Sequence, residues 1–119
     1  MPAESKSNPE LRRLIHDLER RGKKGSPLWG VVARSLARPR HQVRPVNVSH
    51  LDRIVQPDET VVVPTKLLAA GRIQKKIHVA ALAYSDGARR KILAAGGSLM
   101  SLPDLVEKNP DGKGVRIVG

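Results

Sequence analysis

The sequence contains no cysteine and no phenylalanine, and its only large aromatic side chains are those of Trp29 and Tyr84. Without cysteine, neither disulfide bonds nor thiolate metal sites can form. With so few aromatics, the chain differs from RNA-binding domains that stack unpaired bases on an aromatic platform. Any nucleic acid is therefore expected to be recognised through its phosphates and its shape.

Long hydrophobic runs are also missing. The longest nearly apolar stretches are residues 60–64, 67–71 and 78–84, and all three are far too short to cross a bilayer. The N-terminus has no apolar signal region. The sequence thus predicts a soluble, cytoplasmic protein that is neither secreted nor inserted in a membrane.

Acidic residues are scarce. The 119 residues include 22 Lys and Arg but 11 Asp and Glu, so the formal net charge is +11. A surface of this charge favours a polyanion, which can be a nucleic acid, an anionic membrane or an acidic protein.

The shortage of acids is greatest near the N-terminus, because residues 20–51 contain none. The same stretch carries eight positive charges, on Arg20, Arg21, Lys23, Lys24, Arg34, Arg38, Arg40 and Arg44. A merely solvated surface usually mixes charge signs, whereas a stretch of one sign repels itself unless a counter-charge is bound. This imbalance predicts contact with a nucleic acid.

Two amphipathic helices are expected before residue 39. Asn8 can cap the first helix, Pro9 suits its first position, and Gly22 ends it. The second begins after Ser26 and stops near Pro39. Their apolar faces are formed by Leu11, Leu14, Ile15 and Leu18, and by Trp29, Val32, Ala33 and Leu36. The pair is predicted to form a helical hairpin, followed by an extended basic segment at residues 38–44 that becomes ordered along phosphates.

From residue 46 onward, short apolar runs alternate with turn signals, which indicates an α/β core. Strands are expected at residues 46–48, 60–64, 77–84, 98–100 and 114–118. Helices are expected from a Ser49 cap through residue 54, from a Ser85 cap with Ala88, Ile92 and Leu93 facing inward, and at residues 102–107. Turns are expected at residues 56–59, 71, 95–97 and 109–112. The predicted organisation is a basic N-terminal region at residues 1–45 and an α/β core at residues 46–119.

Seven motifs in order carry a family resemblance. They are Asn8-Pro9-Glu10-Leu11, Pro45-Val46-Asn47-Val48-Ser49, Thr60-Val61-Val62-Val63-Pro64, Lys75-Lys76-Ile77-His78-Val79-Ala80-Ala81-Leu82, Ala88-Arg89-Arg90-Lys91-Ile92, Ala94-Ala95-Gly96-Gly97 and Asn109-Pro110-Asp111-Gly112-Lys113-Gly114-Val115-Arg116-Ile117. The chain resembles, over essentially its whole length, the large-subunit ribosomal proteins that unite the bacterial fifteenth protein with the archaeal and eukaryotic eighteenth, and most of all the archaeal branch.

The resemblance implies an α/β fold built as an irregular superhelix of strands and helices, preceded by a basic helical and extended N-terminal region that lies against ribosomal RNA. It also implies that large-subunit ribosomal RNA and neighbouring ribosomal proteins are the partners. The segment 65–71 holds less glycine than the family often carries, so the loop there is expected to be stiffer.

The sequence has no pattern typical of a catalytic or metal-binding site. No two of His16, His41, His50 and His78 have the i, i+4 spacing of a helical metal site, and the few acids are scattered in turns rather than paired. Gly112-Lys113-Gly114 lacks the upstream glycine and the following Ser or Thr of a phosphate loop. The expectation is therefore a protein with no catalytic residues, no metal, no cofactor and no small-molecule substrate.

The predicted function is structural: the protein binds and stabilises ribosomal RNA in the large subunit. Arginine forks would bridge phosphates that otherwise repel one another, and lysines would add less directional charge. The candidate RNA-binding residues are Arg12, Arg13, Arg20, Arg21, Lys23, Lys24, Arg34, Arg38, Arg40, His41, Arg44, Lys66, Arg72, Lys75, Lys76 and Lys113. For the patch from Lys66 to Lys76 and for residues 89–91, a solvated surface is an open alternative. The alternative function is an architectural, chromatin-like DNA-binding protein, which fits the same charge.

Overall fold

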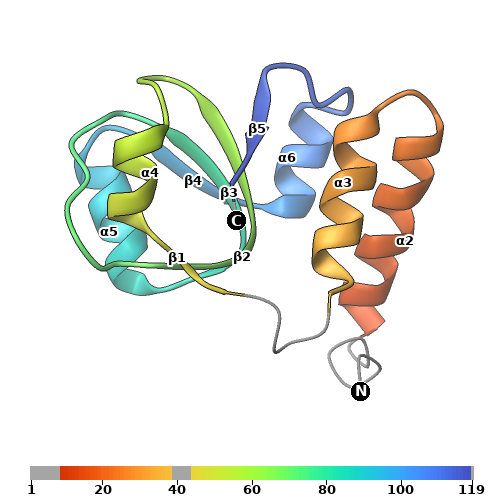
Figure 1. Ribbon diagram of the computed structural model, residues 1–119, viewed down its shortest axis with the longest axis horizontal. Helices are drawn as coiled ribbons and strands as arrows, with labels where there is room; N and C mark the ends of the chain where they lie inside the picture. Colours follow the sequence, from red (N-terminus) through yellow and green to blue (C-terminus); the bar gives the residue numbers. More distant parts are fainter. Residues whose placement is uncertain (1–8, 39–43, 119) are drawn as a thin grey trace.

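The computed structural model describes residues 9–38 and 44–118. Its elements are, in order, α2 (Pro9–Lys23), α3 (Pro27–Leu36), β1 (Val46–Asn47), α4 (Val48–Ile54), β2 (Thr60–Leu68), β3 (His78–Tyr84), α5 (Asp86–Ala94), β4 (Ser98–Ser101), α6 (Leu102–Lys108) and β5 (Val115–Ile117). Figure 1 shows α2 and α3 side by side at one end of the molecule and α4 and α5 at the other.

The strands form one sheet in which every pairing is parallel. The order is β1-β2-β3-β4, and β5 also pairs with β2. Strands β1 and β5 meet opposite ends of β2, because Val46 is in register with Leu67 and Val115 with Thr60. The expected α/β class, with strands and helices winding irregularly in succession, is confirmed.

Parallel neighbours must be joined by a crossover, usually a helix. Helix α4 joins β1 to β2, α5 joins β3 to β4, and α6 lies between β4 and β5. The connection from β2 to β3 is different, because residues 69–77 cross over as a loop without a helix. This loop must therefore be held by other means, which are side chains of α4 and α5.

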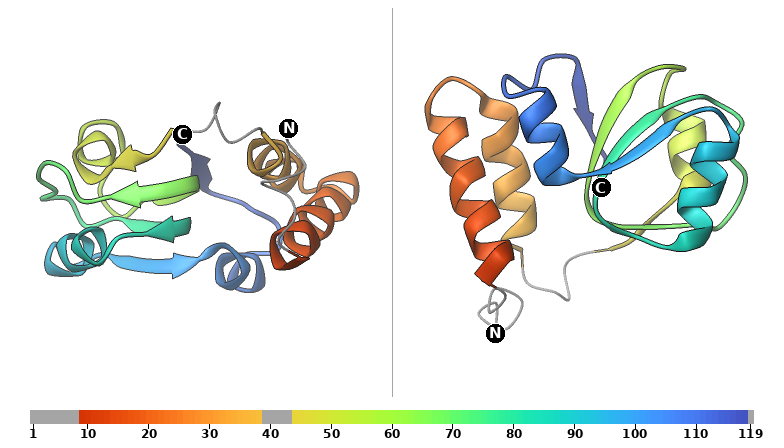
Figure 2. Two further views of the ribbon diagram at one scale, coloured as in Figure 1. Left: turned by 90° about the horizontal axis from the view of Figure 1, so that it is seen from below. Right: turned by 180° about the vertical axis from the view of Figure 1, so that it is seen from behind.

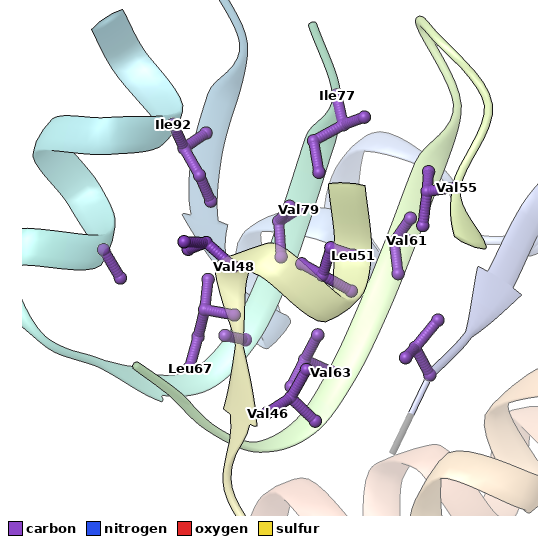
Figure 3. Packing of buried hydrophobic residues seen from close by; sticks show 13 residues of the cluster. Val46, Val48, Leu51, Val55, Val61, Val63, Leu67, Ile77, Val79 and Ile92 are labelled. Carbon is purple, nitrogen blue, oxygen red and sulfur yellow. The ribbon is translucent and has the colours of Figure 1, made fainter. Parts of the chain in front are cut away.

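Each face of the sheet covers its own core, and the apolar alternation of the strands sends side chains to both. On one face, residues of α4 and α5 such as Leu51 and Ile92 pack against Val61, Val63 and Val79 (Figure 3). On the other face, α2, α3 and α6 cover residues that include Val62 and Ala80. The left view of Figure 2 shows the strands one above another, with α4 and α5 on one side of them and α2, α3 and α6 on the other.

The hairpin is confirmed, and its apolar faces are the ones expected. Leu18, Trp29 and Val32 are fully buried. A Cβ on Gly22 would lie 2.8 Å from the Cα of Gly30, so the two helices approach backbone to backbone at this point. The predicted Asn8 cap lies outside the described residues, and Ser26 precedes α3 without a side-chain capping bond.

Strand β2 is longer than predicted. It continues past Pro64 to Leu68, and the register with β3 shifts between Val63 and Lys66. Pro64 has no backbone N–H to donate to a neighbouring strand, but it lies within this register shift, where the ladder of hydrogen bonds is interrupted. The strand predicted at residues 60–64 is therefore four residues too short.

Three further predictions are wrong. Helix α4 starts at Val48 after Asn47, so Ser49 is not its cap. Leu93 is 45% exposed because it lies on the outer side of α5, opposite the buried Ala88 and Ile92. The strand predicted at residues 77–84 is present as β3, but it is not buried throughout. Its last three residues are exposed, because the pairing with β4 ends at Ala81.

Candidate nucleic-acid interface

Helices α2 and α3 and the turn between them carry the largest group of the predicted RNA-binding residues. The exposed cationic residues of this hairpin and its turn are Arg12, Arg13, Arg20, Lys23, Lys24 and Arg34. Arg12, Arg13, His16 and Arg20 also line one open hollow with Pro9 and Asp17. Because the apolar stripe of α2 faces the core, the cations on its other faces remain available to a polyanion.

Arg20 and Arg21 share one carboxylate. Arg20 Nη2 and Arg21 Nε each lie 3.2 Å from an oxygen of Asp17, at i, i+3 and i, i+4 spacing. Burial raises the pKa of Asp17, but hydrogen bonds from Arg21 and Arg20 outweigh it and hold that pKa below its usual value. These two arginines are therefore oriented by the protein itself, and the carboxylate competes with any incoming phosphate.

The turn of the hairpin is joined to the loop between α6 and β5, as Figure 1 shows at the top of the molecule. Trp29 Nε1 donates to the carbonyl oxygen of Pro110 at 2.8 Å, and Ser26 Oγ donates to the same oxygen at 3.4 Å. Lys113 lines a hollow with Gly25. The structure thus brings Lys113 to the end of the hairpin that carries Lys23 and Lys24, a proximity that the sequence did not reveal.

The basic segment after α3 is described only at its ends. Arg38 and Arg44 are exposed. Arg40 and His41 lie outside the described residues. The extended form expected for residues 38–44 thus stays a prediction.

The patch from Lys66 to Lys76 is not uniform. Lys66 is exposed on β2, beside Ala83 of β3, and Arg72 is exposed in the loop. Lys75 Nζ instead donates to the carbonyl oxygen of Val55 at 3.0 Å, and Lys76 Nζ lies 3.5 Å from the carboxylate of Asp58. Lys75 therefore stabilises the loop through its bond to Val55, whereas Lys76 is exposed and belongs to a weak surface ion pair.

Asp52 of α4 orders the loop. Its Oδ1 accepts hydrogen bonds from the backbone N–H of Gln74 at 3.0 Å and of Lys75 at 3.1 Å. The bond from Gln74 is the main reason that the pKa of Asp52 lies below its usual value. A carboxylate that receives two backbone donors fixes the path of this part of the loop.

Several exposed cations were not among the predicted contacts. Arg53 of α4 and Lys108 of α6 are exposed, as are Arg89 and Arg90, which the sequence left undecided. Arg116 Nη1 donates to the carbonyl oxygen of Ile54 at 2.7 Å, and this residue ties β5 to α4. The isolated positions of Arg53 and Lys108 gave no pattern from which contact could be inferred.

One arrangement resembles hydrolytic machinery. His78 Nδ1 lies 2.8 Å from Ser98 Oγ, and His78 Nε2 lies 3.5 Å from Asp58 Oδ1. An acyl-transfer site also needs backbone N–H groups free to stabilise an oxyanion. Here the backbone N–H groups of Gly97 and Ser98 already donate hydrogen bonds to the carbonyl oxygens of Ile92 and Ile77, respectively. The cluster therefore pairs β3 with β4 across the sheet.

The described residues offer neither a metal site nor a membrane-spanning helix. Within residues 9–38 and 44–118, no three His, Asp or Glu side chains are grouped so that they could hold a metal ion. No helix in the described part of the chain is both long and apolar enough to span a membrane.

Comparison with known proteins identifies the family. The model of the family described as ribosomal protein 60S L18 and 50S L18e matches residues 4–118. The chain belongs to this family. The resemblance stated from the seven motifs is confirmed.

Individual relatives agree with this membership. The chain is 45% identical over 114 residues to large ribosomal subunit protein eL18 of Archaeoglobus fulgidus, covering 95% of this chain and 97% of that protein. It is 45% identical over 113 residues to eL18 of Pyrobaculum aerophilum, with 94% and 93% covered, and 43% identical over 115 residues to eL18 of Haloarcula marismortui, with 96% and 98% covered. The relatives are thus matched over nearly their full lengths.

Proposed function

We propose that this protein is a structural constituent of the large ribosomal subunit, where it binds and stabilises large-subunit ribosomal RNA without catalysis. The observation that carries the proposal is family membership over nearly the whole chain, together with relatives named as large-subunit proteins. The charge of +11 supplies the physical means of holding RNA. Its place of action would be the cytoplasmic ribosome, with neighbouring ribosomal proteins as further partners.

The main RNA contact is proposed to be the cationic surface of α2, α3 and the residues that follow. It comprises the predicted contacts of residues 1–45, with Lys113 added at the tip of the hairpin. Residues 46–119 would form the core that supports this surface. The support is direct, because Leu18 and Trp29 of the hairpin belong to the same buried cluster as Val62 and Ala80 of the sheet.

The alternative of architectural DNA binding rests on net charge alone. Charge does not distinguish the two nucleic acids, and the family and the relatives are ribosomal. The proposal therefore keeps RNA as the polyanion.

A binding experiment tests the proposal. The full chain is titrated with a transcript of Archaeoglobus fulgidus large-subunit ribosomal RNA and, in parallel, with duplex DNA of mixed sequence, between about 50 and 400 mM salt, over which the Debye length falls roughly threefold. Affinity for the RNA should exceed that for DNA and fall with salt, by about 0.7 to 0.9 log units per phosphate contact for each tenfold rise in salt. Equal affinity for both, or a flat response to salt, would show the proposal to be wrong.

A further inference from the structure

The loop of residues 69–77 lies at the far end of the molecule from the helical hairpin. The Cα positions extend 36 × 30 × 20 Å, and Figure 1 is drawn with the longest axis horizontal. The loop, drawn in green, lies at the left with α4 and α5, whereas α2 and α3 lie at the right. Figure 2 shows the same separation from below. A ligand at the loop and a ligand on α2 would therefore be held apart by the body of the protein.

The loop is fixed by side chains at both its ends. Asn47 Oδ1 accepts the backbone N–H of Ala70 at 3.3 Å, and Lys91 Nζ of α5 donates to the carbonyl oxygens of Ala69 and Gly71, both at 2.6 Å. At the other end, Asp52 Oδ1 accepts the backbone N–H groups of Gln74 and Lys75. A loop ordered in this way loses little conformational entropy when it binds a ligand.

Two cations line an open hollow between this loop and the last turn of α5. The hollow lies between residues 71–74 and residues 91–95, with Arg72 on the loop side and Lys91 on the helix side. Within the described residues, the Arg72 guanidinium takes part in no hydrogen bond or salt bridge, although its positive charge helps to lower the pKa of Asp52. An ammonium group has three N–H donors. Lys91 therefore retains one donor after its two hydrogen bonds to the carbonyl oxygens of Ala69 and Gly71. The hollow therefore offers a guanidinium fork and an ammonium group to one anion.

The carboxyl end of a helix normally repels anions, and α5 ends at this hollow. The last carbonyls of α5 are occupied, however. Those of Lys91, Ile92 and Leu93 accept the backbone N–H groups of Ala95, Gly97 and Gly96. Two full positive charges outweigh what remains of the half charge of the helix end.

We propose that Arg72 and Lys91 form a second phosphate-binding site, which holds the backbone of an RNA segment different from the one on the hairpin. This inference rests on the proposed function and deepens it, because it makes the protein a bridge between two RNA segments rather than a clamp on one. Both contacts act on the same rigid body, so each raises the effective concentration of RNA at the other.

The first test is a substitution at Arg72 with a matched control. Arg72→Gln removes the fork from an exposed position, and Arg90→Gln removes an exposed charge from α5 outside the hollow. In titrations with the same ribosomal RNA transcript, Arg72→Gln should lower affinity about tenfold and the salt slope by about one. Arg90→Gln should change the affinity less than threefold (about 0.65 kcal/mol). Equal effects of the two substitutions would overturn the site.

The second test locates the RNA. Because the chain has no cysteine, Ala94→Cys beside the hollow and Glu19→Cys on α2 each place a single thiol, to which an iron chelate is attached for hydroxyl-radical cleavage of the bound RNA. The two positions should cut different RNA segments. Cuts from Glu19→Cys alone, or the same cuts from both, would overturn the inference and leave the proposed function standing. Cuts from neither would overturn the proposed function itself.

Discussion

Trp29 of α3 donates its indole N–H to the carbonyl oxygen of Pro110, 2.8 Å away and 81 residues further along the chain. The indole is fully buried and is the only tryptophan in the sequence. A buried indole N–H without an acceptor is costly, so this bond favours docking of the loop before β5 on the hairpin. It places the loop that carries Lys113 at the end of the hairpin that carries Lys23 and Lys24.

Replacing Trp29 with phenylalanine tests this docking. Trp29→Phe keeps an aromatic ring but removes the donor and leaves a small cavity, so the free energy of unfolding should fall by about 2 kcal/mol or more. Urea unfolding followed by circular dichroism measures the change. The control is Tyr84→Phe, at an aromatic residue that is 39% exposed, which should cost less than about 0.5 kcal/mol. Equal stabilities of the two variants would show that the Trp29 bond does not matter.

Much of the fold could be predicted because its signals are local. The helical hairpin follows from apolar spacing and from Pro9 and Pro27, and α5 follows from Ser85, whose side chain does accept the N–H of Ala88 at 3.1 Å. The α4 cap was missed because Asn47 and Ser49 are both capping residues. The structure instead uses the Asn47 side chain to hold Ala70, a long-range contact that local sequence does not reveal.

The candidate site could be predicted less well, because charge alone does not say which cations are occupied. Nothing in the sequence distinguishes Lys75 and Lys91 from the other cations of the chain. In the structure, however, both donate to backbone carbonyl oxygens. Arg72 differs from them because its guanidinium donates to no backbone carbonyl of the described residues, and its charge acts on Asp52 only through space. The loop expected at residues 65–71 is wrong in its bounds, because residues 65–68 belong to β2; the loop begins at residue 69 and is bonded by side chains of Asn47, Asp52 and Lys91.

Glycine at position 71 is required for two reasons. Its φ of +87° is unfavourable for other residues, and a Cβ there would overlap the side chain of Ser49. Gly25 also has a positive φ, +106°, but a Cβ there would meet nothing within 4 Å. Gly71→Ala should therefore destabilise the protein by about 1–3 kcal/mol more than Gly25→Ala, as measured by urea unfolding. Similar losses in the two variants would mean that the loop moves away from α4 without cost.

Stability in acid should depend on Asp52. The pKa of Asp52 is lowered in the folded protein, chiefly by the bond from Gln74. The ionised carboxylate therefore stabilises the fold at pH values above the ordinary aspartate pKa of about 3.9. This stabilisation is lost as the pH falls through the lower pKa of the folded state. Asp52→Asn should be less stable than the wild type at pH 7, and the difference should shrink as the pH falls below about 4. Urea unfolding between pH 7 and pH 3 measures both curves. A difference that stays constant over this range would contradict the role of the carboxylate charge.

The ion pairs of Asp17 allow the hairpin surface to be tested by a gain of binding. The carboxylate lies 3.2 Å from both Arg20 and Arg21 and would repel a phosphate that approaches them. Asp17→Asn removes that charge, so affinity for the ribosomal RNA transcript should rise about two- to fivefold in 0.1 M salt, while stability changes by less than about 1 kcal/mol, because surface pairs contribute little. Glu107→Gln is the control, because it raises the net charge equally from an exposed position on α6. If both substitutions raise affinity alike, net charge alone governs binding and α2 is not the contact; if Asp17→Asn weakens binding, the carboxylate is needed to orient the two arginines.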